Sequence, residues 1–526
     1  MNKPKFVAGP PGTGKTHLFL TKKYKELLKT YSPEKIVILS HTKVAAAEVK
    51  EAILDLQEIK ERGLRKKFFK YRICTIHSFC RNKLLKKDVL DYADYLNLCR
   101  ENSGFKVQRV SQSDFDNDKH KFFRFLNDAF GRGLTIKEHW YALRETSSSY
   151  YPYNNFRMIS EMKEVYDEYK RINQVCDYND MISEFNKLAV APDIDVLIVD
   201  EAQDSNVPQI KALEKMSTNT KEFYMVGDAD QTIFEFAGAS PDYFHNLSKD
   251  AEQLENGLRC GKTINEKCKK IIEPIWNFYG YDRVWKPAEG IIGEDYYLPD
   301  LHTDCSAREA LLNKIKNTDE TFLFTYRGNP SGKWVRSFLT YHGIEFCHVG
   351  SDPYVSKKEI RCHKLWPEFI KGTALPLKQI KEFWNFMGQQ VIVRGKGEET
   401  FEGWVNKDYT IHELIEKKFL RPESLDFTDF YYTRIKSKTD VEKIKYINNL
   451  IREGVDTEGK ARVEYANIHT VKGLTYDNVI VDLTCTRPED YFTQLRLKYV
   501  AYSRGRIDCW TIASQDRYTL GVKHDR

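Results

Sequence analysis

Length, composition and charge describe an ordinary folded protein and exclude several classes. The chain has 526 residues, 41% hydrophobic and 30% charged, which suggests roughly three to four domains with a sizeable core. Its formal charge is only +6, so any nucleic-acid site must be a local patch. The 11 cysteines form no C-x-x-C pair, which argues against a zinc or iron–sulfur centre. The sequence has neither a signal-peptide core nor an apolar run near the ~18 residues of a membrane helix, so we expect a soluble, cytoplasmic protein.

The first informative segment is a glycine-rich loop near the N-terminus. It follows an apolar strand predicted at 5–8 and precedes a helix predicted from His17. The loop fits G-x-x-x-x-G-K-[ST], in which backbone N–H groups close on phosphates, the lysine reaches the β- and γ-phosphates and the hydroxyl binds Mg²⁺. We therefore predict an NTP-hydrolysing enzyme. Its predicted nucleotide-binding loop consists of Gly9, Pro10, Pro11, Gly12, Thr13, Gly14, Lys15 and Thr16. We expect Thr16 to be a metal ligand as well.

Strands that alternate with helices predict an α/β fold with two parallel sheets covered by helices. The first block has strands at 6–8, 36–40, 73–76, 196–199 and 223–226. The second has strands at 321–325, in the segment that ends at 349, and at 463–469, 479–483 and 509–512. Two stretches with helical periodicity, 81–190 and 351–455, are interpreted as insertions. The predicted domains are therefore 1–80 with 191–250, 81–190, 251–350 with 456–526, and 351–455.

Two carboxylates and an amide follow buried strands of the first block. Hydrolysis of a phosphoanhydride needs charge neutralisation and an oriented, deprotonated water. We predict that Asp200 binds Mg²⁺ and that Glu201 takes a proton from the attacking water. Gln231 is the predicted γ-phosphate sensor, because an amide can donate to phosphate and accept from water. The alternative for the two carboxylates is an acidic strand end that faces solvent.

At least seven segments, in order, resemble superfamily 1 DNA helicases of the UvrD/Rep/PcrA type. Residues 200–204 have the form D-E-x-Q-D, and 227–234 match G-D-x-x-Q-S-I-Y. The other segments besides the glycine-rich loop lie at 42–49, 75–80, 176–181, 324–329, 469–474 and 496–504. The resemblance implies two RecA-like domains (1A and 2A) with 1B-like and 2B-like insertions, and with ATP and Mg²⁺ between the two domains. It covers mainly the motor core, because the insertions show little similarity.

The resemblance also implies that arginines complete the nucleotide site. Arg504 closes the last motif, and Arg259 closes 254–259, which resembles L-x-x-N-Y-R. We expect both to arrive from the other domain and to stabilise transition-state charge, with surface salt bridging as the alternative. For Arg327, a nucleotide contact and a structural role stay open. Gly473, in the H-x-x-K-G-L segment, is a further expected nucleotide contact.

Several positions depart from the family pattern. Only eight residues precede Gly9, where the family carries a glutamine-containing segment that contacts adenine. Gly257–Leu258 replaces Asn-Tyr, Thr475 stands at the position of a ribose-contacting glutamate, and Ala237 stands at the position of an arginine. We therefore expect ATP as the nucleotide, with looser discrimination among NTPs.

A track for single-stranded DNA needs aromatic faces for bases and cations for phosphates. His41 stands where the family has a base-stacking phenylalanine, and Phe236 lies five residues after Gln231. Any of these aromatic rings could instead fill the core, and the basic and aromatic run at 65–72 fits a DNA contact or a solvated helix face equally. The predicted DNA-contacting residues are His41, Thr42, His77, Phe234, Phe236 and His469.

These patterns together predict an ATP-dependent DNA helicase that translocates on single-stranded DNA, with a 3′→5′ direction implied by the resemblance alone. We expect single-stranded DNA and single/double-strand junctions as substrates, replication or repair proteins as partners, a bacterial or viral host cell, and a monomer. One alternative is a nucleic-acid-stimulated ATPase translocase or switch that remodels protein–DNA complexes without strand separation. Another is an ordinary P-loop kinase or metabolic ATP enzyme.

Overall fold

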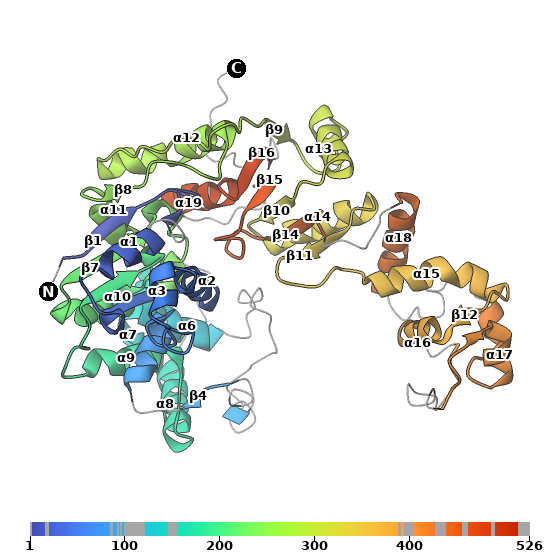
Figure 1. Cartoon of the computed structure of the whole chain (residues 1–526), viewed down its shortest axis with the longest axis horizontal. Coiled ribbons are helices and arrows are strands. Elements are labelled where there is room, and N and C mark those ends of the chain that lie inside the picture. Colours follow the sequence, from blue (N-terminus) through green and yellow to red (C-terminus); the bar gives the residue numbers. More distant parts are fainter. Residues whose placement is uncertain are drawn as a thin grey trace. The chain divides into compact units, whose positions relative to one another are not determined.

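The computed structural model divides the chain into two compact units (Figure 1). The first is Met1–Glu294 with Pro488–Ile507, and the second is Asp295–Arg487 with Asp508–Arg526. Within them the structure describes residues 3–15, 20–84, 88–91, 94, 97–98, 121–145, 156–387, 391–393, 401, 403–426, 438–454, 461–484 and 490–513. None of the helices described there combines the length and apolar character needed to cross a membrane.

The first unit is built on a six-stranded parallel sheet with the order β3-β2-β6-β7-β1-β8. Every residue of β2 and β6 is buried, as expected for parallel strands covered on both faces. The five strands predicted for this block are confirmed, whereas the short β8 is an addition. The strands are β1 (Lys5–Ala8), β2 (Ile36–Ser40), β3 (Ile73–Thr75), β6 (Val196–Val199), β7 (Glu222–Gly227) and β8 (Glu252–Gln253).

Two hydrophobic clusters cover the two faces of this sheet. In β1, Phe6 and Ala8 belong to one cluster and Val7 belongs to the other, because successive side chains of a strand point to opposite faces. The surrounding helices are α1 (Leu20–Leu27), α2 (Lys43–Leu54), α3 (Gln57–Glu61), α4 (Ile76–Lys83), α9 (Tyr178–Lys187), α10 (Val207–Met216), α11 (Pro241–Ser248), α12 (Lys262–Tyr279) and α19 (Tyr491–Tyr502).

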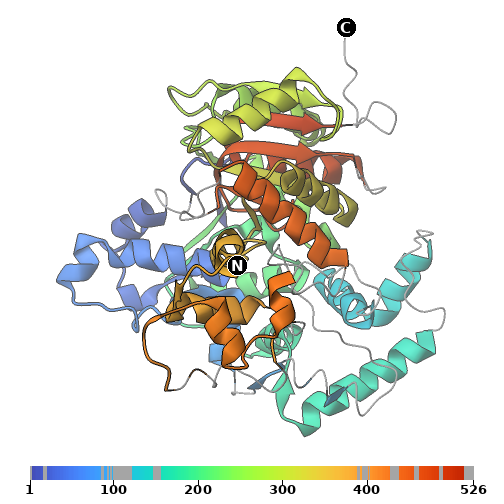
Figure 2. The ribbon, with the colours of Figure 1, turned by 90° about the vertical axis from the view of Figure 1, so that its right-hand side faces the viewer.

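The first insertion is mostly helical in its described part and has a core of its own. Helices α6 (Lys121–Gly131), α7 (Ile136–Glu145) and α8 (Phe156–Ile172) pack in succession, cyan to teal in Figure 2. Their buried residues include Phe122, Phe125, Trp140, Ile159 and Tyr166. A short parallel pair, β4 (Asp88–Val89) with β5 (Val175–Cys176), joins the start and the end of the insertion.

The backbone of this insertion contacts the backbone of the loop that follows Gln231, at Gly131 and Gly238. A Cβ added to Gly131, at the end of α6, would lie 2.1 Å from the Ala237 carbonyl oxygen. A Cβ added to Gly238, whose φ is +89°, would lie 2.1 Å from the carbonyl carbon of Gly131. Only glycine fits at either position, because any side chain would push the two backbones apart.

The second unit carries another six-stranded sheet, with the order β11-β14-β10-β15-β16-β9. Neighbours β11, β14, β10 and β15 are parallel, and β16 is parallel to β9. All the strands predicted for this block form, and β9 is an addition. The strands are β9 (Asp295–Leu298), β10 (Phe322–Tyr326), β11 (Phe346–His348), β14 (Val463–Asn467), β15 (Tyr476–Asp482) and β16 (Gly505–Ile512).

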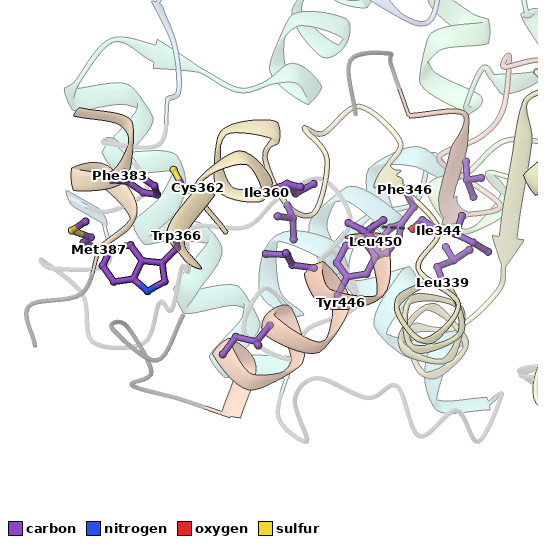
Figure 3. Packing of buried hydrophobic residues seen from close by; sticks show 14 of the residues in the cluster. Leu339, Ile344, Phe346, Ile360, Cys362, Trp366, Phe383, Met387, Tyr446 and Leu450 are labelled. Atoms are coloured by element: carbon purple, nitrogen blue, oxygen red, sulfur yellow. Dashed lines mark hydrogen bonds between the residues drawn. The ribbon is translucent and has the colours of Figure 1, made fainter. Parts of the chain in front are cut away.

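The second insertion shares one continuous core with this sheet. Figure 3 shows that core from Phe346 and Ile344 to Trp366 and Phe383. Tyr446 closes the junction, since its hydroxyl donates to the Ile344 carbonyl at 2.8 Å. The helices of this unit are α13 (Ser306–Asn317), α14 (Asn329–Tyr341), α15 (Lys357–Ile370), α16 (Leu377–Phe386), α17 (Ile411–Glu416) and α18 (Lys438–Arg452), with an antiparallel pair β12 (Leu375–Pro376) and β13 (Asp408–Tyr409).

The predicted α/β class with two parallel sheets and helical insertions is therefore confirmed, but the compact units have other boundaries than the predicted domains. Residues beyond 250 stay with the first unit because β8 pairs with β1. Pro488–Ile507 also belongs there, because α19 packs against α12. The finer division into four domains stays a prediction.

Candidate nucleotide and nucleic-acid site

The glycine-rich loop is anchored at the carboxyl end of β1. The Gly9 N–H donates to the Gly227 carbonyl at 3.0 Å, which fixes the loop to the end of β7. Gly12 and Gly14 have φ values of +74° and +77°, a conformation open to glycine at no steric cost. Thr16 lies outside the described residues, so its predicted role as a metal ligand stays a prediction.

Lys15 lies inside this loop, and its ammonium group is almost fully buried. Its Nζ donates to the carbonyls of Gly9 at 2.7 Å and Pro10 at 3.4 Å. Burial lowers the pKa of Lys15, while the carboxylates of Glu201, Asp228 and Asp200 act in the opposite direction. A buried cation held only by carbonyl dipoles and more distant carboxylates is well suited to bind a phosphate anion.

The two predicted carboxylates follow β6. Asp200 is fully buried, and the half-buried Glu201 has a left-handed backbone with φ +50°. A non-glycine residue in this region costs of order 1–3 kcal/mol, and such strain concentrates at functional sites. Gln203 holds the arrangement together: its Nε2 donates to Glu201 at 2.6 Å, and its Oε1 accepts from the Asp228 N–H at 3.1 Å. The ends of β6 and β7 are thus locked to each other.

Gln231 and the two predicted arginines lie in the same unit as the glycine-rich loop. The Gln231 side chain donates to Asp228 at 2.8 Å and accepts from Arg504 Nη2 at 3.1 Å. Arg259 donates to the Ser503 carbonyl at 3.4 Å. Burial and then the neighbouring Arg259 lower the pKa of Arg504 to about 10. A buried Arg504 and a half-buried Arg259 that repel each other favour an anion beside them.

Both arginines lie in the same compact unit as the glycine-rich loop, and their origin in the other RecA-like domain stays a prediction. Leu258 N–H donates to the Gly12 carbonyl at 2.7 Å, and a Cβ on Gly12 would lie 2.3 Å from the Arg259 Cβ. The Arg259 segment therefore packs directly on the glycine-rich loop. Arg504 joins the same unit because the preceding helix, α19, packs on α12.

A buried ionic network behind Gln231 was not predicted. Arg283 donates to both Asp228 and Asp230, Trp276 donates to Asp230 at 2.8 Å, and Tyr499 donates to Asp228 at 3.1 Å. Burial raises the pKa of Asp230 to about 6. For Asp228 burial acts in the same direction, but Arg283 and Lys15 outweigh it and the pKa is lowered. Arg283 lies in no recognised motif, so only the fold reveals its role.

The predicted DNA-contacting residues of the 41–42 and 75–80 segments also have structural roles. His41 Nε2 lies 3.0 Å from the Ser205 hydroxyl. Thr42 is exposed and caps α2 by accepting from the Ala45 N–H at 3.1 Å. His77 is half-buried, its ring meets the exposed Tyr178 ring edge-on at 5.3 Å, and burial lowers its pKa to about 4. A neutral imidazole beside an exposed phenol suits stacking with bases better than ionic contact with phosphates.

Phe234 and Phe236 lie in the loop that follows Gln231. Phe234 is half-buried and precedes the single turn η8 (Glu235–Ala237). The backbone of Phe236 belongs to η8, while its side chain lies outside the described residues. The DNA contact predicted for Phe236 stays a prediction.

The three predicted residues of the second unit follow β10 and β14. Arg327 Nη1 lies 3.2 Å from His469 Nδ1, and the Asn467 side chain donates to the Arg327 carbonyl at 2.7 Å. Gly473 is exposed and has φ +89°, and a Cβ added to it would have no heavy atom within 4 Å. The structure thus brings Arg327 and His469 together within this unit.

Comparison with known proteins agrees with this geometry. The model of the UvrD/REP helicase N-terminal domain matches residues 1–252. Residues 1–252 are therefore similar to the UvrD/REP helicases. A probable DNA helicase II homolog of Mycoplasma capricolum is 23% identical to this chain, covering 91% of it and 69% of that protein. The ATP-dependent DNA helicases Rep of Buchnera aphidicola and PcrA of Bacillus subtilis are 25% and 24% identical over 68% of this chain, which spans only 55% and 50% of their lengths.

Among solved structures, an arterivirus nonstructural protein 10 (helicase) is similar with a TM-score of 0.31 and 10% identity, covering 98% of this chain and 60% of that one. Such weak similarity carries no argument. The similarity to UvrD/REP helicases rests on the sequence match of residues 1–252 and on the order of the motifs.

The donor set of the UvrD/REP domain fits Mg²⁺ bound together with nucleotide phosphates. No group of three or more His, Cys, Asp or Glu side chains suited to a metal occurs among the described residues. Mg²⁺ in nucleotide sites uses one or two carboxylates, with phosphate oxygens and waters completing the octahedron. Asp200, buried at the end of β6, provides such a carboxylate.

Proposed function

We propose that this chain is an ATP-dependent DNA helicase that translocates on single-stranded DNA. The observation that carries the proposal is the gathering, in one unit, of a buried lysine, two carboxylates, an amide and two arginines, one buried and one half-buried. These residues are Lys15, Asp200, Glu201, Gln231, Arg259 and Arg504. The names of the relatives in the UvrD/REP family support ATP and DNA as substrates.

In the proposed mechanism, the phosphates of ATP replace the carbonyl groups as partners of Lys15. Mg²⁺, held by Asp200 and by the hydroxyl of Thr16, would neutralise phosphate charge. Glu201 takes the proton from the attacking water, and its bond from Gln203 fixes the direction of the carboxylate. Arg259 and Arg504 stabilise the charge that develops on the transferred phosphoryl group.

Gln231 connects hydrolysis to the DNA. It binds Asp228 and Arg504 at one end of a segment that leads to Phe234 and Phe236. Binding of the γ-phosphate at Gln231 would change, through that segment, how bases stack on these aromatic rings and on His41 and His77. We propose 3′→5′ movement from the resemblance to this type of helicase, and Arg327, His469 and Gly473 of the second unit as further nucleotide or DNA contacts.

The deciding measurement is the ATPase rate with no nucleic acid, with single-stranded DNA and with RNA of the same sequence. The proposal expects strong stimulation by DNA and weaker stimulation by RNA. A rate unaffected by any oligonucleotide would overturn it and favour a metabolic ATP enzyme. A strand-displacement assay with 3′ and 5′ tailed duplexes then tests unwinding and direction. Stimulated ATPase without displacement on either substrate would indicate a translocase that remodels protein–DNA complexes.

A further inference from the structure

Helix α19 and the residue two positions beyond it hydrogen-bond both ends of the segment 228–235. In the last turn of the helix, Tyr499 donates to Asp228, and two residues beyond its end Arg504 donates to Gln231. Near its start, Thr493 and Arg496 bind Glu235, which lies directly after Phe234. All these residues belong to the first unit.

The Glu235 contact is the best defined of these bonds. Glu235 Oε1 accepts from Thr493 Oγ1 at 3.1 Å and from Arg496 Nε at 3.0 Å, and Arg496 Nη2 donates to the same oxygen. The Arg496 side chain is 3% exposed and that of Glu235 is 30% exposed. A charge-assisted pair with one buried partner and more than one donor is stronger and better oriented than a surface ion pair.

The geometry of the helix makes these contacts act together. Thr493 and Arg496 are three residues apart, as are Arg496 and Tyr499, so the side chains of each pair are neighbours on the helix surface. The 12 residues of α19 form a rod of about 18 Å at 1.5 Å per residue. A displacement of Glu235 therefore moves the helix as a body, while the irregular segment between Gln231 and Glu235 absorbs motion more easily.

We propose that Glu235 is a positioning residue that couples DNA binding to the nucleotide site through Arg496 and α19. The inference rests on the proposed function, because it needs DNA near Phe234 and Phe236 and ATP near Gln231. DNA that displaces η8 pulls Glu235, and α19 transmits the displacement to Tyr499 and to Arg504, which set Asp228 and Gln231. Neither Glu235 nor Arg496 touches the reacting atoms in this scheme.

The test is a thermodynamic cycle on the full chain. The affinity for a fluorescent, non-hydrolysable ATP analogue is measured with and without a saturating oligo-dT, and the ratio is the coupling factor. Factors of about 5–150 are typical of coupled sites. Glu235→Ala should reduce the factor about fivefold or more, towards 1, while the analogue affinity without DNA and the basal ATPase rate change less than twofold. Thr493→Val, which removes one of the donors, should give a smaller reduction in the same direction.

Glu222→Ala is the matched control. Glu222 has a side chain that is 24% exposed and pairs with Lys5 at 2.7 Å on β7, away from α19. It should leave the coupling factor unchanged. A wild-type chain that binds oligo-dT but shows no coupling, or that shows no DNA-stimulated ATPase, would contradict the proposed function. A wild type that couples, together with a Glu235→Ala variant that folds and couples equally, would overturn this inference alone.

Discussion

The two units contain sheets of similar size but place different chemistry at the ends of their strands. In the first, β6 and β7 lead directly into Asp200, Glu201 and Asp228, and these side chains are held by a buried hydrogen-bond network. In the second, β10 leads into Arg327, and His469 follows β14. Under the proposed function the first unit binds phosphates and activates water, whereas the second offers cationic and imidazole groups suited to contacts with anions. A shared architecture supplies a frame, and the residues after each strand decide its function.

Replacement of Arg504 should have the largest effect on the ATPase rate. Arg504→Ala should reduce the DNA-stimulated kcat by roughly 10³–10⁵ while nucleotide affinity changes far less, because an arginine finger acts on transition-state charge. Steady-state ATPase kinetics and analogue binding measure the two quantities. Arg506→Ala is the control, because Arg506 lies two residues further along and is exposed. Equal kcat values in the Arg504 and Arg506 variants would make Arg504 a structural residue.

Glu201→Gln should have the next largest effect on the rate. Loss of a general base costs about 10²–10⁴ in kcat, and glutamine retains the shape that Gln203 binds. Binding of the ATP analogue should stay near the wild-type value. Single-turnover hydrolysis with DNA present measures the chemical step, and turnover near the wild-type rate would show that another group deprotonates the water.

A pair of glycine variants compares the two units directly. Gly12 and Gly473 both have positive φ, but an added Cβ meets Arg259 at 2.3 Å in the first case and nothing within 4 Å in the second. Gly12→Ala should displace the Arg259 segment and weaken analogue binding more than tenfold. Gly473→Ala should cost only backbone strain, about 1–2 kcal/mol of unfolding free energy. Equal losses of nucleotide affinity would show that Gly473 also approaches the phosphates.

The smallest effect concerns pH and a buried histidine of the first unit. Burial lowers the pKa of His245 to about 3, and its ring stacks on Tyr279 at 4.1 Å. The unfolded chain takes up a proton near pH 6.5 and the folded chain does not, so stability contributed by neutral His245 is present above pH 6.5 and falls below it. Between pH 7 and 5.5 the loss is about 1 kcal/mol.

His245→Gln should remove this loss and flatten the pH dependence of urea unfolding over that range. The exposed His412 of the second unit provides the control, and His412→Gln should leave the dependence unchanged. A wild-type slope retained in the His245 variant would assign the pH sensitivity to other groups, with His77 as the next candidate because burial lowers its pKa to about 4.

Much of the fold could be predicted because buried parallel strands read as continuous apolar runs, as in Val196–Val199. Short strands such as β8 and β9 carry no such signal, because they are short or largely exposed. Motif spacing also singled out Lys15, Glu201 and Gln231, whose roles stay predictions. It could not identify Arg283, because the partners Asp228 and Asp230 lie more than 50 residues away in the sequence. The sequence also could not show that Arg259 and Arg504 lie in one compact unit with the glycine-rich loop, since the return of the chain into the first unit depends on packing between α12 and α19.

The close approach of Gly131 and Gly238 limits how modular the first insertion can be. Its sequence shows little similarity to the family, which makes it an obvious part to exchange between relatives or to delete. Yet the end of α6 passes at backbone distance over the turn that follows Phe236. A replacement insertion would need a glycine at the position of Gly131. With any other residue there, the loop expected to contact DNA would change its conformation. The junction, more than the rest of the insertion, should therefore set which grafts keep a working motor.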